Sequence, residues 1–197
     1  MTREQAPDAT PARLVTDTRL DSLGLHASIV AGLNARGFTQ ATPIQADTLP
    51  LALDGRDIAG QANTGTGKTA AFLLATLDRL LRNTPREVDE TPAGAARPRA
   101  LILAPTRELA EQIYQDALPL AEQTGLKCVV CYGGTGYESQ REAIGAGVDV
   151  LIGTPGRLID YYKQKIYTLA AIEVAVLDEA DRMFDLGFID DVRYLFR

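Results

Sequence analysis

The chain has 197 residues, of which 46% are hydrophobic and 23% are charged, and its formal net charge is −6. This length suffices for one packed domain but not for a second one of ordinary size. No apolar run reaches the roughly 20 residues that span a bilayer, and the first residues lack the apolar core of a secretory signal. We therefore expect a cytoplasmic protein with no membrane contact. Its acidic charge weighs against a broadly basic nucleic-acid surface.

Metal and thiol chemistry have few candidate residues in this chain. His26 is the only histidine, so no histidine-based metal cluster can form, and we interpret it as a structural residue. Cys128 and Cys131 have the spacing of a redox or metal pair. They lie in the strand-like stretch KCVVCY, however, where residues three apart point to opposite faces. We expect two buried, inert thiols.

The first half of the chain predicts two helices and one strand. Apolar residues recur at helical spacing over residues 25–33, before the natural helix stop Gly37. The stretch RDIAGQA at 56–62 predicts a short buried strand, and residues 69–81 predict a helix. Residues 83–99 are rich in Pro, charge and small side chains, which indicates a solvated loop.

Beyond this loop, short apolar runs alternate with helical patterns. The predicted strands are 100–104, 127–132, 148–153 and 173–178. The predicted helices are 107–124, 137–147 and 156–164. Short β-branched runs separated by helices are typical of parallel strands that are covered on both faces. The fold class is therefore predicted to be α/β with a mostly parallel sheet.

The stretch ANTGTGKT, at 62–69, has a phosphate-binding pattern between the predicted strand and helix. Small residues let successive N–H groups wrap an anion at a helix N-terminus, which carries partial positive charge. Lys68 would reach the outer phosphates, and the Thr69 hydroxyl would ligate Mg²⁺. A plain glycine-rich turn is the alternative. The nucleotide-contacting candidates here are Ala62, Asn63, Thr64, Gly65, Thr66, Gly67, Lys68 and Thr69.

A second pattern, VAVLDEAD, ends at Asp181. Its strand would deliver Asp178 and Glu179 to the carboxyl edge of the sheet, where open α/β proteins bind ligands. One acid can hold Mg²⁺ through water, and its neighbour can polarise an attacking water. A solvated strand end is the alternative reading. The pairing with the phosphate loop favours an ATPase site.

These two patterns and four others resemble a known family in order and spacing. The others are GFTQATPIQ at 37–45, PTRELA at 105–110, the GG pair at 133–134 and TPGR at 154–157. From about Thr18 onward, the chain resembles the first RecA-like domain of DEAD-box ATP-dependent RNA helicases. Stretches between the motifs are similar to a bacterial branch of that family associated with RNA degradation.

The resemblance implies a RecA-like P-loop NTPase fold that uses ATP and Mg²⁺. It implies catalytic roles for Lys68, Asp178 and Glu179, with Asp178 near the metal and Glu179 as general base. It also implies that Gln45 reads the adenine edge, since an amide can both donate and accept, and that Phe38 lies against the base. Phe38 could instead pack as core against the preceding helix.

The remaining motifs are similar to the RNA-contacting loops of the family. The implied contacts are Pro105, Thr106, Arg107, Gly133, Gly134, Thr154, Pro155, Gly156 and Arg157. Their hydroxyls, guanidinium groups and N–H groups suit phosphate and ribose, which carry no sequence information and fit an enzyme acting on many RNAs. A few local hydrogen-bond donors of this kind could bind RNA although the net charge of the chain is negative. The degradation-associated branch further implies an endoribonuclease as partner.

Thr, Pro, Ala and charged residues predict a mobile tail at 1–17, and the resemblance divides the rest into a Q-motif region at 18–46 and an incomplete RecA-like domain at 47–197. Two positions depart from the family pattern. Leu20 stands where the family usually has an aromatic residue, and Ala41 replaces a common proline. Both departures leave details of the adenine contact open.

The family continues into a Ser-Ala-Thr motif and a second RecA-like domain, so we expect these residues to be a fragment that is inactive alone. In the family, the strand carrying Ser-Ala-Thr lies between those ending at the phosphate loop and at DEAD. A sheet lacking it would leave N–H and C=O groups unpaired, each costing about 1–3 kcal/mol. Over a whole strand, that cost approaches the stability of a domain.

The leading hypothesis is an ATP-dependent RNA helicase, in which ATP and RNA close two domains and separate short duplexes locally. One alternative is an RNA- or protein-binding module that retains nucleotide binding without turnover. The intact Lys68, Thr69, Asp178 and Glu179 argue against it. Another alternative is a DNA-translocating helicase, which fits the phosphate loop but not GFTQATPIQ.

Overall fold

The protein is built on a parallel sheet of four strands in the order β2-β3-β1-β4. The structure, a computed structural model, describes residues 15–63, 65–85, 92–134 and 136–196. The strands are β1 (Ala100–Leu103), β2 (Cys128–Cys131), β3 (Val150–Gly153) and β4 (Val174–Leu177). The central strands β1 and β3 are buried along their whole length, as expected for a sheet covered on both faces.

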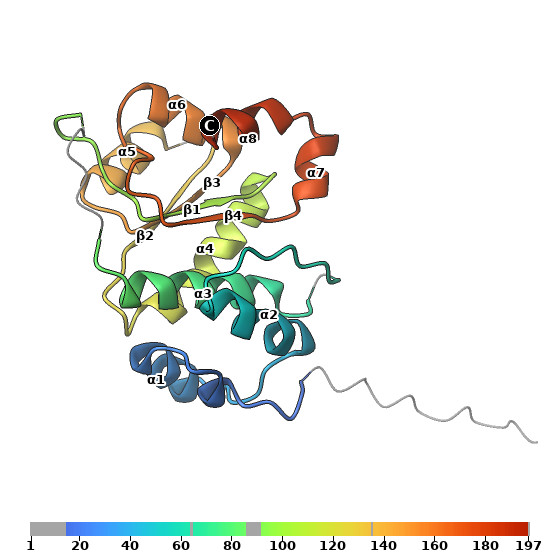
Figure 1. Ribbon diagram of the computed structural model, residues 1–197. Coiled ribbons are helices and arrows are strands. Elements are labelled where there is room, and N and C mark those ends of the chain that lie inside the picture. The colour runs from blue at the N-terminus through green and yellow to red at the C-terminus, as the bar shows by residue number, and fades with distance from the viewer. Residues whose placement is uncertain (1–14, 64, 86–91, 135, 197) are drawn as a thin grey trace, which may run out of the picture.

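Helices cover both faces of the sheet (Figure 1). One side carries α3 (Lys68–Arg82) and α4 (Arg107–Ala121), with η1 (Leu20–Leu23), α1 (Ala27–Ala35) and α2 (Pro43–Leu53) packed around them. The other side carries α5 (Tyr137–Gly145), α6 (Pro155–Lys163), α7 (Ala180–Asp185) and α8 (Ile189–Leu195). The predicted α/β class with helices on both faces is confirmed.

The alternation of side chains along each strand divides the core into two clusters. Ile102 and Val150 belong to the cluster on the α3 and α4 side, and Leu101 and Leu151 to the other. Each strand and helix predicted beyond residue 99 is present, with ends shifted by at most three residues. No helix among the described residues is long and apolar enough to cross a membrane.

The two thiols lie on opposite faces of β2, as the alternation predicts. Cys131 is fully buried in the α5 and α6 cluster, whereas Cys128 is half-buried against the other one. Burial raises the pKa of each thiol to about 12, so both are protonated at neutral pH. His26 is a structural residue, since its ring accepts a hydrogen bond from the Ser28 N–H and caps α1.

The strand predicted at 56–62 is wrong. These residues form no regular structure, and Ile58 is 40% exposed. A strand needs a neighbour for its N–H and C=O groups, and 56–62 has none among the described residues: the ladder of β4 runs to β1 alone. The mobile tail predicted at 1–17 lies mainly in residues 1–14, which are outside the described part of the chain.

A buried ion pair fixes the start of β4 beside β1. The Arg99 Nε donates to Glu173 Oε1 at 2.6 Å, and both side chains are more than nine-tenths buried. Asn83, at the end of α3, donates to the second carboxylate oxygen at 2.8 Å. Burial alone would raise the pKa of Glu173, but the hydrogen bonds from Arg99 and Asn83 outweigh it and hold that pKa below its usual range.

Glu173→Ala is expected to lower the free energy of unfolding by about 3 kcal/mol at pH 7, because it leaves the Arg99 charge buried without a partner. Because the pKa of Glu173 is lowered by folding, its stabilisation is present above the unfolded pKa of about 4.3 and disappears as the pH falls through the folded pKa. Glu173→Gln, which removes the carboxylate charge, should also have a lower free energy of unfolding than the wild type at pH 7, and this difference should shrink in acid. Urea unfolding at several pH values tests this.

The matched control is Asp190→Asn, which breaks an exposed pair with Arg193 and should leave stability unchanged within error. A deficit of Glu173→Gln that stays constant from pH 7 down to acid would contradict the assigned role of the carboxylate charge.

Candidate functional site

The candidate motifs after β1 to β4 meet at one edge of the sheet. Because the four strands are parallel, their carboxyl ends lie side by side. Pro105–Arg107 follow β1, the GG pair at 133–134 follows β2, Thr154–Arg157 follow β3, and Asp178 follows β4. Pro105 and Pro155 are buried, whereas Gly133, Gly134 and Gly156 are exposed to solvent at this edge.

The predicted phosphate loop is held by hydrogen bonds to its own backbone. Thr66 Oγ1 donates to the Asn63 carbonyl at 2.7 Å, and the Lys68 ammonium donates to the Ala62 carbonyl at 2.5 Å. The loop leads directly into α3, a helix of 15 residues with Thr69 in its first turn. An anion at this helix N-terminus would meet the Lys68 charge and unpaired N–H groups. Thr64 lies outside the described residues.

Two glycines give this loop its shape. Gly65 and Gly67 have φ of +82° and +90°, a region that side chains with a Cβ rarely adopt. A Cβ on Gly65 would meet open space. A Cβ on Gly67 would lie 2.7 Å from Gln45 Nε2 and 2.9 Å from Thr42 Oγ1. Gly67 is therefore required both by its conformation and by the close approach of the Q-motif segment.

Gln45 bridges the Q-motif segment and the phosphate loop. Its buried amide donates to the Gly67 carbonyl at 3.2 Å and accepts from the Thr42 N–H at 3.0 Å. The Thr42 hydroxyl is buried and has no partner among the described residues. The amide of Gln45 thus has a structural task at the loop. Its predicted contact with adenine stays a prediction.

The three candidate catalytic residues lie close together, since α3 packs against β4. Burial raises the pKa of Asp178, although the nearby Lys68 ammonium and the Glu179 N–H, which donates to Asp178 Oδ1 at 3.0 Å, both act to lower it. Glu179 has a φ of +49°, a strained conformation of the kind that clusters at active sites. Its carboxylate accepts from Arg182 at 3.1 Å.

Phe38 is 58% exposed, so the alternative that it packs as core is wrong. Leu20 and Ala41, the two departures from the family pattern, are both buried in the cluster beside α3 and α4. Leu20 thus retains the apolar packing expected of it. Phe38 lies within the stretch GFTQATPIQ, and its exposed side chain is accessible to a ligand.

The two candidate RNA-contacting arginines share a network that the sequence did not indicate. The Arg107 guanidinium lies 4.7 Å from the ring centre of Tyr132, and the Cβ position of Gly134 is 4.0 Å from Arg107. Arg157 donates to the side chain of Gln140, which also binds the backbone of Tyr132. Thr106 caps α4 by accepting from the Leu109 N–H. Half-buried Thr154 donates its backbone N–H to Cys131.

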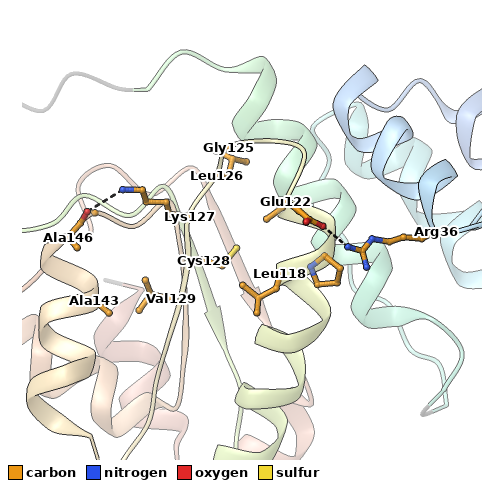
Figure 2. A pocket seen from close by; sticks show the side chains of 13 residues that line it. Arg36, Leu118, Glu122, Gly125, Leu126, Lys127, Cys128, Val129, Ala143 and Ala146 are labelled. Atoms are coloured by element: carbon orange, nitrogen blue, oxygen red, sulfur yellow. Dashed lines mark hydrogen bonds and ion pairs between the residues drawn. The ribbon is translucent and has the colours of Figure 1, made fainter.

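One hollow on the described surface is lined by residues outside all of these motifs (Figure 2). It is a groove of about 780 Å³ beside the amino end of β2, between α4 and α5. The Arg36–Glu122 ion pair stands at one side, and Lys127 donates to the Ala146 carbonyl at the other. Its lining is mainly apolar and contains none of the candidate site residues. The candidate residues therefore favour the open carboxyl edge over this groove as the candidate site.

Substitution of the two loop glycines separates conformation from packing. Both Gly65→Ala and Gly67→Ala should lose about 1 kcal/mol of unfolding free energy for the left-handed backbone. Gly67→Ala should lose about 1–3 kcal/mol more, because its Cβ collides with Gln45 and Thr42. Urea unfolding measures both values. Equal losses would show that the close approach of the Q-motif segment is not maintained.

Three similar proteins share one functional name. The protein named ATP-dependent RNA helicase RhlB from Idiomarina loihiensis is 59% identical over 183 residues, which are 93% of this chain and 42% of the relative. Its namesake from Photobacterium profundum is 57% identical over 93% of this chain and 41% of its own length. That from Xanthomonas oryzae pv. oryzae is 59% identical over 93% and 31%. RhlB is the bacterial branch that the stretches between the motifs resemble.

The chain thus spans between about a third and two fifths of the length of these relatives. The profile of the DEAD/DEAH box helicases matches residues 42–197, a range that holds the phosphate loop, both acids and the arginine network. With most of its length matched in this way, the chain belongs to the DEAD/DEAH box helicase family.

Proposed function

We propose that this chain provides the ATP-binding part, and part of the RNA-binding surface, of an ATP-dependent RNA helicase. The observation that carries the proposal is the position of Lys68, at the start of α3, beside Asp178 at the end of β4. A triphosphate on the α3 N-terminus would face both acids. Its hydrolysis, coupled to RNA binding, would drive local separation of short duplexes.

Each residue has a role in this proposal. Lys68 binds the outer phosphates, and Glu179 is the general base that orients and deprotonates the attacking water. Thr69 and Asp178 would hold Mg²⁺, largely through water. When bound, this ion neutralises charge on the phosphates. Gln45 and the exposed Phe38 would contact adenine.

The other proposed partner is RNA, bound through its backbone. The candidate contacts after β1, β2 and β3 offer guanidinium groups, hydroxyls and exposed glycine N–H groups, which recognise phosphate and ribose. A cytoplasmic location, a role in RNA degradation and an endoribonuclease partner belong to the same proposal and rest on the resemblance to the RhlB branch. The relatives are named as RNA helicases, which favours RNA over DNA as the ligand.

Lys68→Ala in the intact protein is expected to lower the rate of ATP hydrolysis at least 100-fold, because the charge facing the outer phosphates is lost. Phosphate release should be measured with and without single-stranded RNA. The control is Lys127→Ala, which removes an exposed lysine at the opposite end of the sheet. Wild-type protein whose hydrolysis is not stimulated by RNA would instead support the binding module without turnover.

Glu179→Gln is expected to keep binding of ATP and RNA while slowing hydrolysis about 100-fold or more, because the amide cannot accept a proton from water. Fluorescent nucleotide binding and single-turnover phosphate release separate the two effects. Asp185→Asn, at an exposed acid at the end of α7, is the charge-matched control. Retained single-turnover hydrolysis in Glu179→Gln would remove Glu179 from the proposed role, and stronger stimulation by DNA would favour the DNA-translocating alternative.

A further inference from the structure

Gln140 lies at the centre of the arginine network. Its side-chain amide pairs with the backbone of Tyr132 as a peptide group would: Oε1 accepts from the Tyr132 N–H at 3.1 Å, and Nε2 donates to the Tyr132 carbonyl at 3.3 Å. The same Oε1 accepts from Arg157 at 3.2 Å. Gln140 thus joins the segment leading into Gly133 and Gly134 to the guanidinium on α6.

The surrounding backbone leaves room for this amide. Gly136, which precedes α5, has a φ of +66°, and a Cβ there would lie 3.3 Å from Gln140 Nε2. In addition, the Tyr161 hydroxyl accepts from Arg157 at 3.2 Å and donates to the Tyr137 carbonyl at 2.7 Å. Gln140 and Arg157 are therefore held by contacts from α5, α6 and the segment after β2.

Every partner of Arg157 in this network is uncharged. The guanidinium lies 5.0 Å from the ring centre of Tyr137 and 5.3 Å from that of Tyr161, and no carboxylate pairs with it in the part of the chain that the structure describes. Arg99 shows the contrary arrangement, since its charge is compensated by Glu173. A neutral amide and two ring faces can orient a guanidinium without cancelling its charge.

We propose that Gln140 is a positioning residue for RNA binding: it orients the uncompensated Arg157 guanidinium beside the loop at 132–134, where both would bind one stretch of RNA phosphate backbone. The inference rests on the proposed RNA binding and adds to it a residue outside the candidate motifs. The neutrality of the Gln140 side chain is as important as its hydrogen bonds. A carboxylate at this place would keep the hydrogen bonds to Arg157 and the Tyr132 N–H but remove the charge available to phosphate.

The test compares Gln140→Ala and Gln140→Glu in the intact protein with Gln123→Ala and Gln123→Glu, which change an exposed glutamine after α4. The probe is a fluorescein-labelled single-stranded oligouridylate, titrated at several KCl concentrations. Gln140→Ala should weaken binding about 3- to 10-fold. Gln140→Glu should weaken it further and reduce the salt slope by about one, as expected for the loss of one phosphate contact. The Gln123 variants should bind as wild type.

A merely structural role for Gln140 makes the opposite prediction for the glutamate. Because that variant keeps both acceptor bonds and loses only the Nε2 bond that alanine loses too, it would then bind RNA no more weakly than Gln140→Ala and with the wild-type salt slope, and this result would overturn the proposal. Wild-type binding by both Gln140 variants would also overturn it, while leaving the helicase function intact. Failure of the wild-type protein itself to bind the oligouridylate would overturn the proposed function together with the inference.

A double-mutant cycle gives a second test that does not depend on the glutamate variant. If Gln140 acts through Arg157, Gln140→Ala should have little further effect on RNA affinity once Arg157→Ala is present. Independent, multiplicative effects of the two substitutions would contradict the positioning role. Thermal unfolding of each variant shows whether a lost affinity merely reflects lost folding.

Discussion

The parallel direction of the four strands is the constraint on which the rest of the structure depends. It brings the carboxyl ends of β1 to β4 to a single edge, so that residues more than 70 positions apart, from Pro105 to Glu179, lie at that edge. The buried Arg99–Glu173 pair supports the same arrangement at the amino ends of β1 and β4. The position of the candidate site thus follows from the parallel topology, because the candidate residues after β1 to β4 stand directly beyond the carboxyl ends of these strands.

The phosphate loop is the exception, because no strand of this sheet leads into it. Its position is set by the packing of α3 against β4 and by the Gln45 bond to the Gly67 carbonyl. Lys68 meanwhile donates to a neutral carbonyl of its own loop. Phosphate oxygens carry charge and are stronger acceptors, so on the proposed function a nucleotide would take over this ammonium. On the proposed function, a phosphate oxygen would replace the Ala62 carbonyl as the acceptor of the Lys68 hydrogen bond.

Local sequence patterns predicted most of this fold. The predictions failed where the structure depends on contacts between residues that are distant in the sequence. The four strands and the helices α4, α5 and α6 follow from their own periodicity, whereas α7 and α8 were not predicted. The strand at 56–62 was wrong because pairing is not a local property, and α2 was missed although Thr42, Pro43 and Gln45 form a helix-start pattern. Gln140 could not be found, since nothing in the sequence shows that its amide meets Tyr132 and Arg157.

The network around Arg157 also bears on how an acidic protein can bind a polyanion. A net charge of −6 is spread over the whole chain, whereas binding depends on the potential within roughly 10 Å of the phosphate. Several arginines elsewhere, including Arg36 and Arg182, are paired with carboxylates. Arg107 and Arg157 instead lie against tyrosine rings. A guanidinium held by neutral groups keeps its field, so on the proposed function two such residues at one edge would attract RNA phosphates although the average charge of the protein opposes it.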